Sequence, residues 1–333
     1  MKKISVNEVK QVVKLIKLSK KIFITGHINP DGDVLGSALA LYLWIKQNFK
    51  DKLVDIYFNS LSQQYTFLPN ADKIEIVNEK DVNKIKQKEY DLGIILECSD
   101  ISRVGDIANF VKFKYLINID HHQNHKNLVN SALSIIYPEY ASCAEIIFDI
   151  FELSKIKINK DIAICLYTGI VSDTGMFQWS NTNEHSFYTA SKLYSYGVRP
   201  YYIYKNLYRQ KSYNSILLLS KVLSTLEIKK IGKYNVGSIY VTQKMLKDTN
   251  TTLFDTEDFI NFPMEVKDVN ISIFFKEIGK NLVKVSFRSD VINVEKIAGK
   301  WSGGGHKYAA GATILGSITS VKKTVLKYLE KVL

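Results

Sequence analysis

Short apolar runs alternate with longer segments of helical periodicity along the first half of the chain. The runs lie at residues 22–25, 53–57, 92–96 and 115–119, and residues 37–45 have the spacing of a helix. Strands that are apolar at nearly every position are typical of a sheet covered on both faces, and such sheets are largely parallel. The pattern therefore predicts an α/β domain over residues 1–185.

The pattern changes after Asn181. Residues 186–231 carry tyrosine, leucine and lysine at helical spacing, with Gly197 and Pro200 as a break, and we interpret them as a helical linker. Strand-like runs return at residues 235–241, 269–275 and 282–287, before an amphipathic helix at 319–333. We expect a second, smaller α/β domain at 232–333, and a length of 333 residues agrees with two domains.

Composition excludes several classes of protein. An apolar share of 46% with 23% charged residues excludes a disordered or fibrous chain. Because no run of about 18 apolar residues occurs and lysines interrupt the first 26 residues, we expect a cytoplasmic protein without membrane contact. Cys98, Cys143 and Cys165 share no CxxC spacing, which favours buried thiols in a reducing compartment.

The chain is basic, with 45 Lys and Arg against 33 Asp and Glu and a net charge of +12. This balance favours anionic partners such as phosphates or nucleic acid. Lysines scattered over a solvated face are the better explanation of the charge, so charge alone assigns no ligand.

Ionisable side chains follow three of the apolar runs. Ligands of parallel sheets bind beyond the carboxyl ends of the strands, so we expect these groups to meet at one edge, joined by Asp173 at the end of the apolar stretch 162–171. The groups are His27, Asp31 and Asp33 after the first run, Glu97 and Asp100 after the third, and Asp120, His121 and His122 after the fourth.

Carboxylate and imidazole donors together suit Mn²⁺, Fe²⁺ or Zn²⁺. Six or seven such groups are too many for one ion and suit two ions about 3.5–4 Å apart, an arrangement typical of phosphoester hydrolysis. Burying the groups without a partner would be costly. One alternative stays open, in which Asp33 caps the following helix and His27 is an ordinary turn histidine.

The C-terminal third contains a glycine triplet, Gly303–Gly305, followed by His306 and Lys307. Consecutive glycines allow backbone N–H groups to approach an anion closely. Arg288 is a second candidate phosphate anchor, because guanidinium geometry matches a phosphate. A flexible turn and a rim arginine remain the alternatives.

These motifs, in this order, resemble the DHH/DHHA1 phosphoesterases, specifically the stand-alone bacterial type. That type includes oligoribonuclease/pAp phosphatases and cyclic-di-AMP or pApA phosphodiesterases. The resemblance covers nearly the whole chain and rests on residues 27–33, 120–122, 141–145, 169–175 and 303–306. It implies a mostly parallel-sheet DHH domain at 1–185, a helical linker at 186–231 and a DHHA1 domain at 232–333.

The resemblance also implies roles for individual residues. Two Mn²⁺ ions, with Mg²⁺, Fe²⁺ or Co²⁺ as alternatives, are expected on His27, Asp31, Asp33, Glu97, His121 and Asp173. The family usually has aspartate where this chain has Glu97, so Asp100 is an alternative ligand. Asp120 and His122 are expected to be catalytic, with His122 near the scissile phosphate, and the expected substrate-binding residues are Arg288, Gly303, Gly304, Gly305 and His306.

The expected activity is a manganese-dependent phosphodiesterase or oligoribonuclease. Its expected substrates are cyclic-di-AMP, pApA or very short oligoribonucleotides (nanoRNA), hydrolysed to mononucleotides while the second domain closes over them. Long nucleic acid is not expected to bind, and the resemblance is compatible with a homodimer. The alternatives are a 3′-phosphatase acting on pAp and a nucleotide-binding protein without activity.

Overall fold

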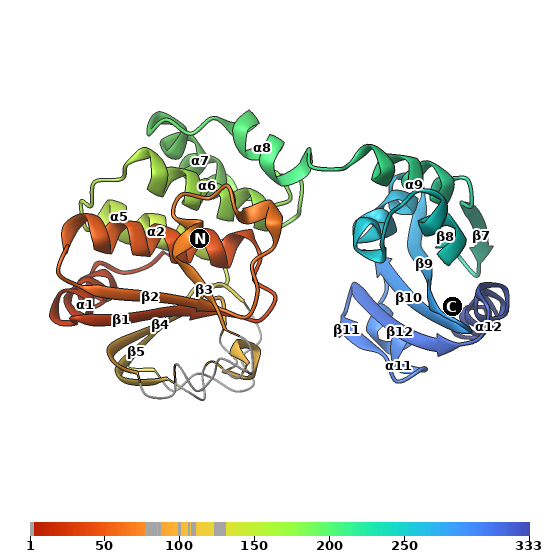
Figure 1. Ribbon diagram of the computed structural model, residues 1–333, viewed down its shortest axis with the longest axis horizontal. Coiled ribbons are helices and arrows are strands. Elements are labelled where there is room, and N and C mark those ends of the chain that lie inside the picture. Colours follow the sequence, from red (N-terminus) through yellow and green to blue (C-terminus); the bar gives the residue numbers. More distant parts are fainter. Residues whose placement is uncertain are drawn as a thin grey trace. The chain divides into compact units, whose positions relative to one another are not determined.

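The computed structural model describes residues 3–77, 85, 88–98, 101–105, 107, 111–122 and 131–333. The chain forms two compact units, Met1–Gln210 and Lys211–Leu333 (Figure 1). The helices predicted as a linker are divided between them. α7 (Glu184–Ser195) and α8 (Pro200–Tyr208) belong to the first unit, and α9 (Tyr213–Leu223) belongs to the second.

The first unit contains a six-stranded parallel sheet, as the uninterrupted apolar runs predict. The strand order is β3-β2-β1-β4-β5-β6, so β1 and β4 lie side by side at the centre. The strands are β1 (Lys21–Gly26), β2 (Leu53–Phe58), β3 (Ile74–Ile76), β4 (Glu89–Leu96), β5 (Lys112–Asp120) and β6 (Leu133–Ile136). Parallel order brings the carboxyl ends of β1, β4 and β5 to one edge.

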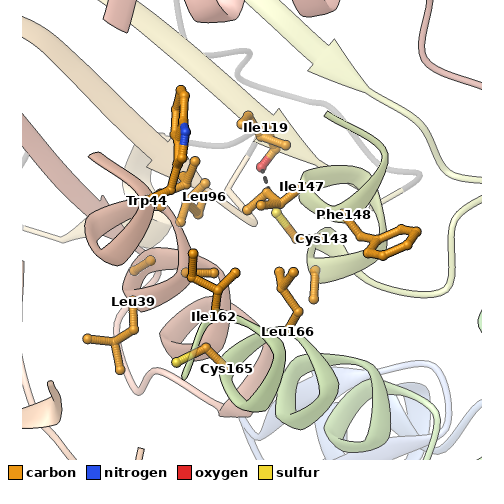
Figure 2. Close-up of a cluster of buried hydrophobic side chains, with 14 of the residues drawn as sticks. Leu39, Trp44, Leu96, Ile119, Cys143, Ile147, Phe148, Ile162, Cys165 and Leu166 are labelled. Atoms are coloured by element: carbon orange, nitrogen blue, oxygen red, sulfur yellow. Dashed lines mark hydrogen bonds between the residues drawn. The ribbon is translucent and has the colours of Figure 1, made fainter. Parts of the chain in front are cut away.

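Helices cover one face of this sheet, and Figure 1 shows α2, α5 and α6 together on that side. Their apolar side chains meet the sheet in a continuous core, of which Figure 2 shows Trp44, Leu96, Ile119, Phe148 and Leu166. The helices of this unit, besides α7 and α8, are α1 (Val6–Leu18), α2 (Gly32–Asn48), α5 (Cys143–Leu153) and α6 (Lys160–Asp173). Short 3₁₀ turns lie at η1 (Gln63–Tyr65), η2 (Ala71–Lys73) and η3 (Ile101–Val104).

The opposite face of the sheet is also buried. Phe23, Tyr57, Ile95 and Leu116 form a second cluster there, with Val104 of η3. Burial on both faces explains why the strands are apolar at consecutive positions. The three cysteines are buried as free thiols, as predicted.

The second unit has a mixed six-stranded sheet in the order β11-β12-β10-β9-β8-β7, antiparallel except between β8 and β9. Its strands are β7 (Glu227–Ile231), β8 (Tyr234–Val241), β9 (Val269–Gly279), β10 (Leu282–Ser289), β11 (Gly304–His306) and β12 (Ala309–Leu315). The other elements are α10 (Gln243–Asp248), η4 (Leu253–Thr256), η5 (Phe259–Glu265), α11 (Val294–Gly299) and α12 (Ile318–Val332). The α/β fold with two domains is therefore confirmed.

The two faces of the second sheet are covered by different helices. One core joins Val283, Val285 and Phe287 of β10 to α11 and α12. The other joins Phe274 of β9 to α9, α10 and η5. In the part of the chain that the structure describes, no helix is both long enough and apolar enough to cross a bilayer.

Candidate metal centre

The loop between β1 and α2 holds the first group of side chains. Asp31 is the N-cap of α2, and its Oδ1 accepts hydrogen bonds from the backbone N–H groups of Asp33 (3.0 Å) and Val34 (3.1 Å). The alternative in which Asp33 is the cap is therefore wrong. Capping fixes one carboxylate oxygen of Asp31, and the other lies 3.8 Å from His27 Nε2.

Asp33 lies inside the first turn of α2, and its side chain is fully buried. Its carboxylate accepts hydrogen bonds from the backbone N–H groups of Cys143 (2.6 Å) and Ala144 (2.9 Å), at the N-terminus of α5. The positive end of that helix stabilises the buried negative charge. Gly169 of α6 makes the room, since a Cβ there would lie 2.6 Å from Asp33 Oδ1.

Glu97 directly follows β4 and is buried. Its backbone has a left-handed conformation (φ +53°), while its N–H donates to the carbonyl of Ile119 (2.9 Å). Non-glycine residues seldom adopt this conformation, so the surrounding structure holds Glu97 in it. Asp100, the alternative ligand, lies outside the described residues.

The two oxygens of Glu97 face different histidines. Oε2 lies 3.3 Å from Nε2 of His27, and Oε1 lies 3.7 Å from Nε2 of His121. Nδ1 of His27 donates to the carbonyl of Ile28 (2.9 Å), because a carbonyl oxygen can only accept. In the neutral ring Nε2 then carries the lone pair, which is the form that binds metals.

Asp173 is the last residue of α6, so this acid arrives from a helix end and not from a strand. Its Oδ2 lies 3.0 Å from Nε2 of His121, and Asp33 Oδ2 lies 3.9 Å from the same nitrogen. Asn181 holds the backbone here, because its amide donates to the carbonyl oxygens of Asp173 (2.8 Å) and Ala141 (3.2 Å).

The structure thus assembles two groups of possible ligand atoms. Within each group, all of these atoms lie within 4.8 Å of one another. One group contains His27, Asp31 and Glu97, and the other contains Asp33, Glu97, His121 and Asp173. Glu97 belongs to both. This is the arrangement expected of a carboxylate shared by two cations.

The chemistry of these groups fits bound cations. Glu97 Oε1 and His121 Nε2 are buried and make no hydrogen bond among the described residues. Burial, with the nearby charges of Asp33 and Asp31, raises the pKa of Glu97 well above its usual value. Burial also raises the pKa of Asp173 to about 6. Divalent cations would supply the charge that these buried carboxylates require.

The nearby carboxylates also change the pKa of His121. Burial alone lowers the pKa of its ring, but the contact with Asp173 and the charge of Asp33 outweigh this effect and raise the pKa to about 9. The ring therefore sits in an environment that favours positive charge, whether carried by a proton or by a metal ion.

Asp120 and His122 form a separate pair beside this cluster. The fully buried Asp120 accepts hydrogen bonds through Oδ1 from Nδ1 of His122 (2.7 Å) and from the backbone N–H of His122 (3.0 Å). The His122 side chain is 39% exposed, and its ring centroid lies 4.7 Å from that of His121. Asp120 thereby orients a partly exposed imidazole and sets its tautomer.

The predicted substrate residues lie in the second unit. Arg288 of β10 is half-buried, which lowers the pKa of its guanidinium, and it donates to the carbonyl of its neighbour Phe287 (3.1 Å). Lys284 shares the same face of β10 and pairs across the sheet with Lys276 of β9. Burial, then the charge of Lys284, lowers the pKa of Lys276 to about 8.

The glycine triplet is not a flexible turn. Gly304 and Gly305 begin β11, which pairs with β12, and a Cβ on Gly303 or Gly305 would overlap the backbone of β12. Space is open beside Gly304. The backbone of His306 pairs with Ala309, while its side chain lies outside the described part of the chain.

Two residues of interest were missed by the sequence reasoning. Asn181 carries a polar side chain in a polar loop, so nothing in the sequence marks its bond to Asp173. Lys276 is one lysine among many, and only the cross-strand register places it opposite Lys284, on the face of the sheet that Arg288 shares. In both cases the signal is a tertiary contact.

Comparison with known proteins agrees with this geometry. Residues 21–170 match the DHH family, N-terminal domain, and residues 240–333 match the DHHA1 domain. A protein of Mycoplasma genitalium named bifunctional oligoribonuclease and PAP phosphatase NrnA is 30% identical over 94% of both chains. The protein of the same name from Bacillus subtilis is 25% identical over 91% of this chain and 92% of its own.

A solved structure extends the similarity to the whole fold. The crystal structure of an exopolyphosphatase-related protein from Bacteroides fragilis matches with a TM-score of 0.85 and 27% identity, covering 99% of this chain and 98% of that one. Both domain matches, the relatives and the cluster of acids and histidines point the same way. The chain is a hydrolase that belongs to the DHH/DHHA1 family of phosphoesterases.

Proposed function

We propose that this protein binds two divalent cations, of which Mn²⁺ suits the mixed carboxylate and imidazole donors, and hydrolyses short nucleotides. The observation that carries the proposal is the position of Glu97 between two ligand groups. His27 and Asp31 would hold one cation, Asp33, His121 and Asp173 the other, and Glu97 would contact both. When bound, the pair would stabilise negative charge on the phosphoryl group and make water more acidic.

The protein's own residues would then orient the reaction. Asp120 holds Nδ1 of His122, so the other ring nitrogen is the one that can hold or donate a proton at a phosphate oxygen or the leaving group. The N-terminus of α5 and the gap at Gly169 keep Asp33 in place without side-chain freedom. Such fixed geometry is what lowers the barrier for in-line displacement.

The second unit would bind the remainder of the nucleotide. Arg288 and Lys276 are half-buried cations on the same face of the sheet, and a guanidinium matches a phosphate in two parallel hydrogen bonds. The backbone of Gly303–Gly305 and the side chain of His306 would add further contacts. This assignment rests on the sequence motif and on the cations around it.

The proposed substrates are pApA, cyclic-di-AMP and oligoribonucleotides of a few residues. The relatives named above combine oligoribonuclease and PAP phosphatase in their names. That similarity favours short RNA as the main substrate. It also favours a second activity, which is removal of the 3′-phosphate from pAp. Both reactions attack one phosphorus atom with water and release an alcohol oxygen, so one centre can perform both.

The test is release of AMP from pApA by the Mn²⁺-loaded protein, followed by the variant Glu97→Gln. Loss of the shared carboxylate is expected to reduce the rate by about 10³-fold, because several kcal/mol of charge stabilisation depend on it. Metal analysis should show fewer ions bound per chain. Asp100→Asn is the matched control and should retain activity. Full activity of Glu97→Gln, or its loss in Asp100→Asn, would assign the shared ligand to Asp100.

A further inference from the structure

The loop after Asp173 has an unusual backbone. Gly175, Met176 and Phe177 follow one another in the left-handed conformation, with φ of 53°, 57° and 67°. Two of these residues are not glycine, and non-glycine residues rarely enter this region in succession. Such strain persists only where the surrounding structure imposes it, and it is concentrated at functional sites.

Hydrogen bonds impose this conformation. The backbone N–H groups of Gln178 (2.9 Å) and Trp179 (3.0 Å) donate to the carbonyl of Thr174, and the N–H of Phe177 donates to the Thr174 hydroxyl (3.1 Å). The N–H of Met176 donates to the carbonyl of Val171 (2.9 Å). The loop is therefore a rigid extension of α6.

The rigid loop presents an indole to solvent. Trp179 is 59% exposed, yet its ring lies so close to Gly175 that a Cβ there would overlap it. Phe177 lies in the same loop and stacks on Phe187 of α7, with ring centroids 5.3 Å apart at 23°. Trp179 is thus a large apolar side chain that is held against Gly175 and is more than half exposed.

This indole lies close to the metal centre. Gly175 is two residues from Asp173, which limits their separation to about 7 Å. The loop also returns to Asp173 at its other end, because Asn181 donates to the carbonyl of Asp173 (2.8 Å). The ring is therefore within the reach of a base whose own phosphate is held beside Asp173.

We propose that Trp179 is a stacking platform for a nucleobase of the substrate. The inference rests on the proposed function, since it assumes a nucleotide phosphate at the metal centre. Stacking accepts any base, because every base has a flat π-face. Trp179 would therefore distinguish nucleotides from simple phosphodiesters without distinguishing one base from another.

The experiment compares pApA with a dinucleotide analogue that lacks its bases, using Trp179→Ala, Trp179→Phe and the control Phe254→Ala. Phe254 is 71% exposed and lies in the second unit. Trp179→Ala is expected to raise KM for pApA by about 10- to 100-fold and to leave the abasic analogue nearly unchanged. Trp179→Phe keeps a flat ring and should remain close to wild type.

A second readout does not need catalysis. Titration with AMP should quench tryptophan fluorescence in the wild type, and the part of the quenching that comes from Trp179 should be lost in Trp179→Phe while KM stays low. Trp44, which is buried, and Trp301, which packs on Tyr328 in the second unit, are present in both proteins, so the difference between the two titrations reports Trp179.

The outcomes separate this inference from the proposed function. A wild-type protein that hydrolyses neither diester would overturn the proposed function, whereas AMP quenching would still test stacking. A Trp179→Ala variant with an unchanged KM for pApA, or with an equal rise for both substrates, would overturn the stacking role. A lower melting temperature with that equal rise would make Trp179 a structural residue.

Discussion

The two units of this protein differ in the charged groups that they present: buried carboxylates in the first and basic side chains in the second. The first, with 26 Lys and Arg against 22 Asp and Glu, buries carboxylates and imidazoles in one cluster. The second has 19 basic residues against 11 acidic ones and carries Lys276 and Arg288 half-buried on one face of its sheet. One arrangement suits cations, and the other suits an anionic ligand.

Buried carboxylates need more support from the surrounding structure than half-exposed cations do. Buried carboxylates repel one another and lose hydration, so each must be fixed by backbone donors or by a cation. Asp33 and Asp31 are fixed in this way by helix N-termini. Half-exposed lysine and arginine keep part of their hydration and need less support. The first unit should therefore be the more sensitive to small changes in packing.

Gly169→Ala should displace a carboxylate of the metal centre in the first unit. A Cβ would meet Asp33 Oδ1 and the Cβ of Ala144, each at 2.6 Å, and would push the carboxylate from its place. We expect a fall in AMP release from pApA of about 10²-fold, since displacement of a ligand by about 1 Å costs that much. Ala is the better helix former, so the loss would not come from helix propensity.

Gly299→Ala is the matched control, because a Cβ there has no neighbour within 4 Å. It should keep wild-type activity and Mn²⁺ content. Full activity in Gly169→Ala would show that the cluster tolerates movement of Asp33, and the contrast between the units would then be wrong.

Arg288→Ala should affect the second unit through substrate affinity. Hydrogen bonds to a charged group contribute about 1.5–3 kcal/mol, so KM for pApA should rise by about 10- to 100-fold with little change in kcat. Arg288→Lys keeps the positive charge but lacks the paired N–H donors of the guanidinium group, so it should recover only part of the affinity. Steady-state kinetics would decide, and a fall in kcat at constant KM would contradict the binding role.

Affinity for AMP should fall as pH rises from 7 to 9.5 in protein freed of metal. Because the pKa of Lys276 is lowered to about 8, this lysine loses its charge within that range, whereas an ordinary lysine keeps it. A bound anion favours the protonated form, so binding takes up a proton and weakens as protons become scarce. We expect a two- to fivefold effect by calorimetry, about the size of one partly exposed ion pair.

Lys276→Gln should weaken this pH dependence and leave the part that His121, with a pKa of about 9, contributes in metal-free protein, while the affinity stays near that of the wild type at pH 9.5. The same slope in both proteins would mean that another group titrates. Because Arg288 stays charged throughout, it should supply the affinity that remains at high pH.

The sequence was sufficient for most of the architecture, although the segment predicted as a helical linker is divided between the two units and ends in β7. Apolar runs predicted the parallel sheet because burial on both faces leaves few positions for polar residues. The positions of His27, Asp31 and His121 directly after apolar runs indicated a single cluster, because parallel strands end at a common edge, whereas Asp173 joins it from the end of a helix.

Only the tertiary structure decided the details of the site. Asp31, and not Asp33, caps α2, because the carboxylate of Asp33 meets the N-terminus of α5 instead. That helix starts 110 residues later in the chain than Asp33. The position of Glu97 between two groups depends on its left-handed backbone. Sequence patterns report local periodicity and burial, whereas distances of a few ångströms between remote side chains arise from packing and from strand register.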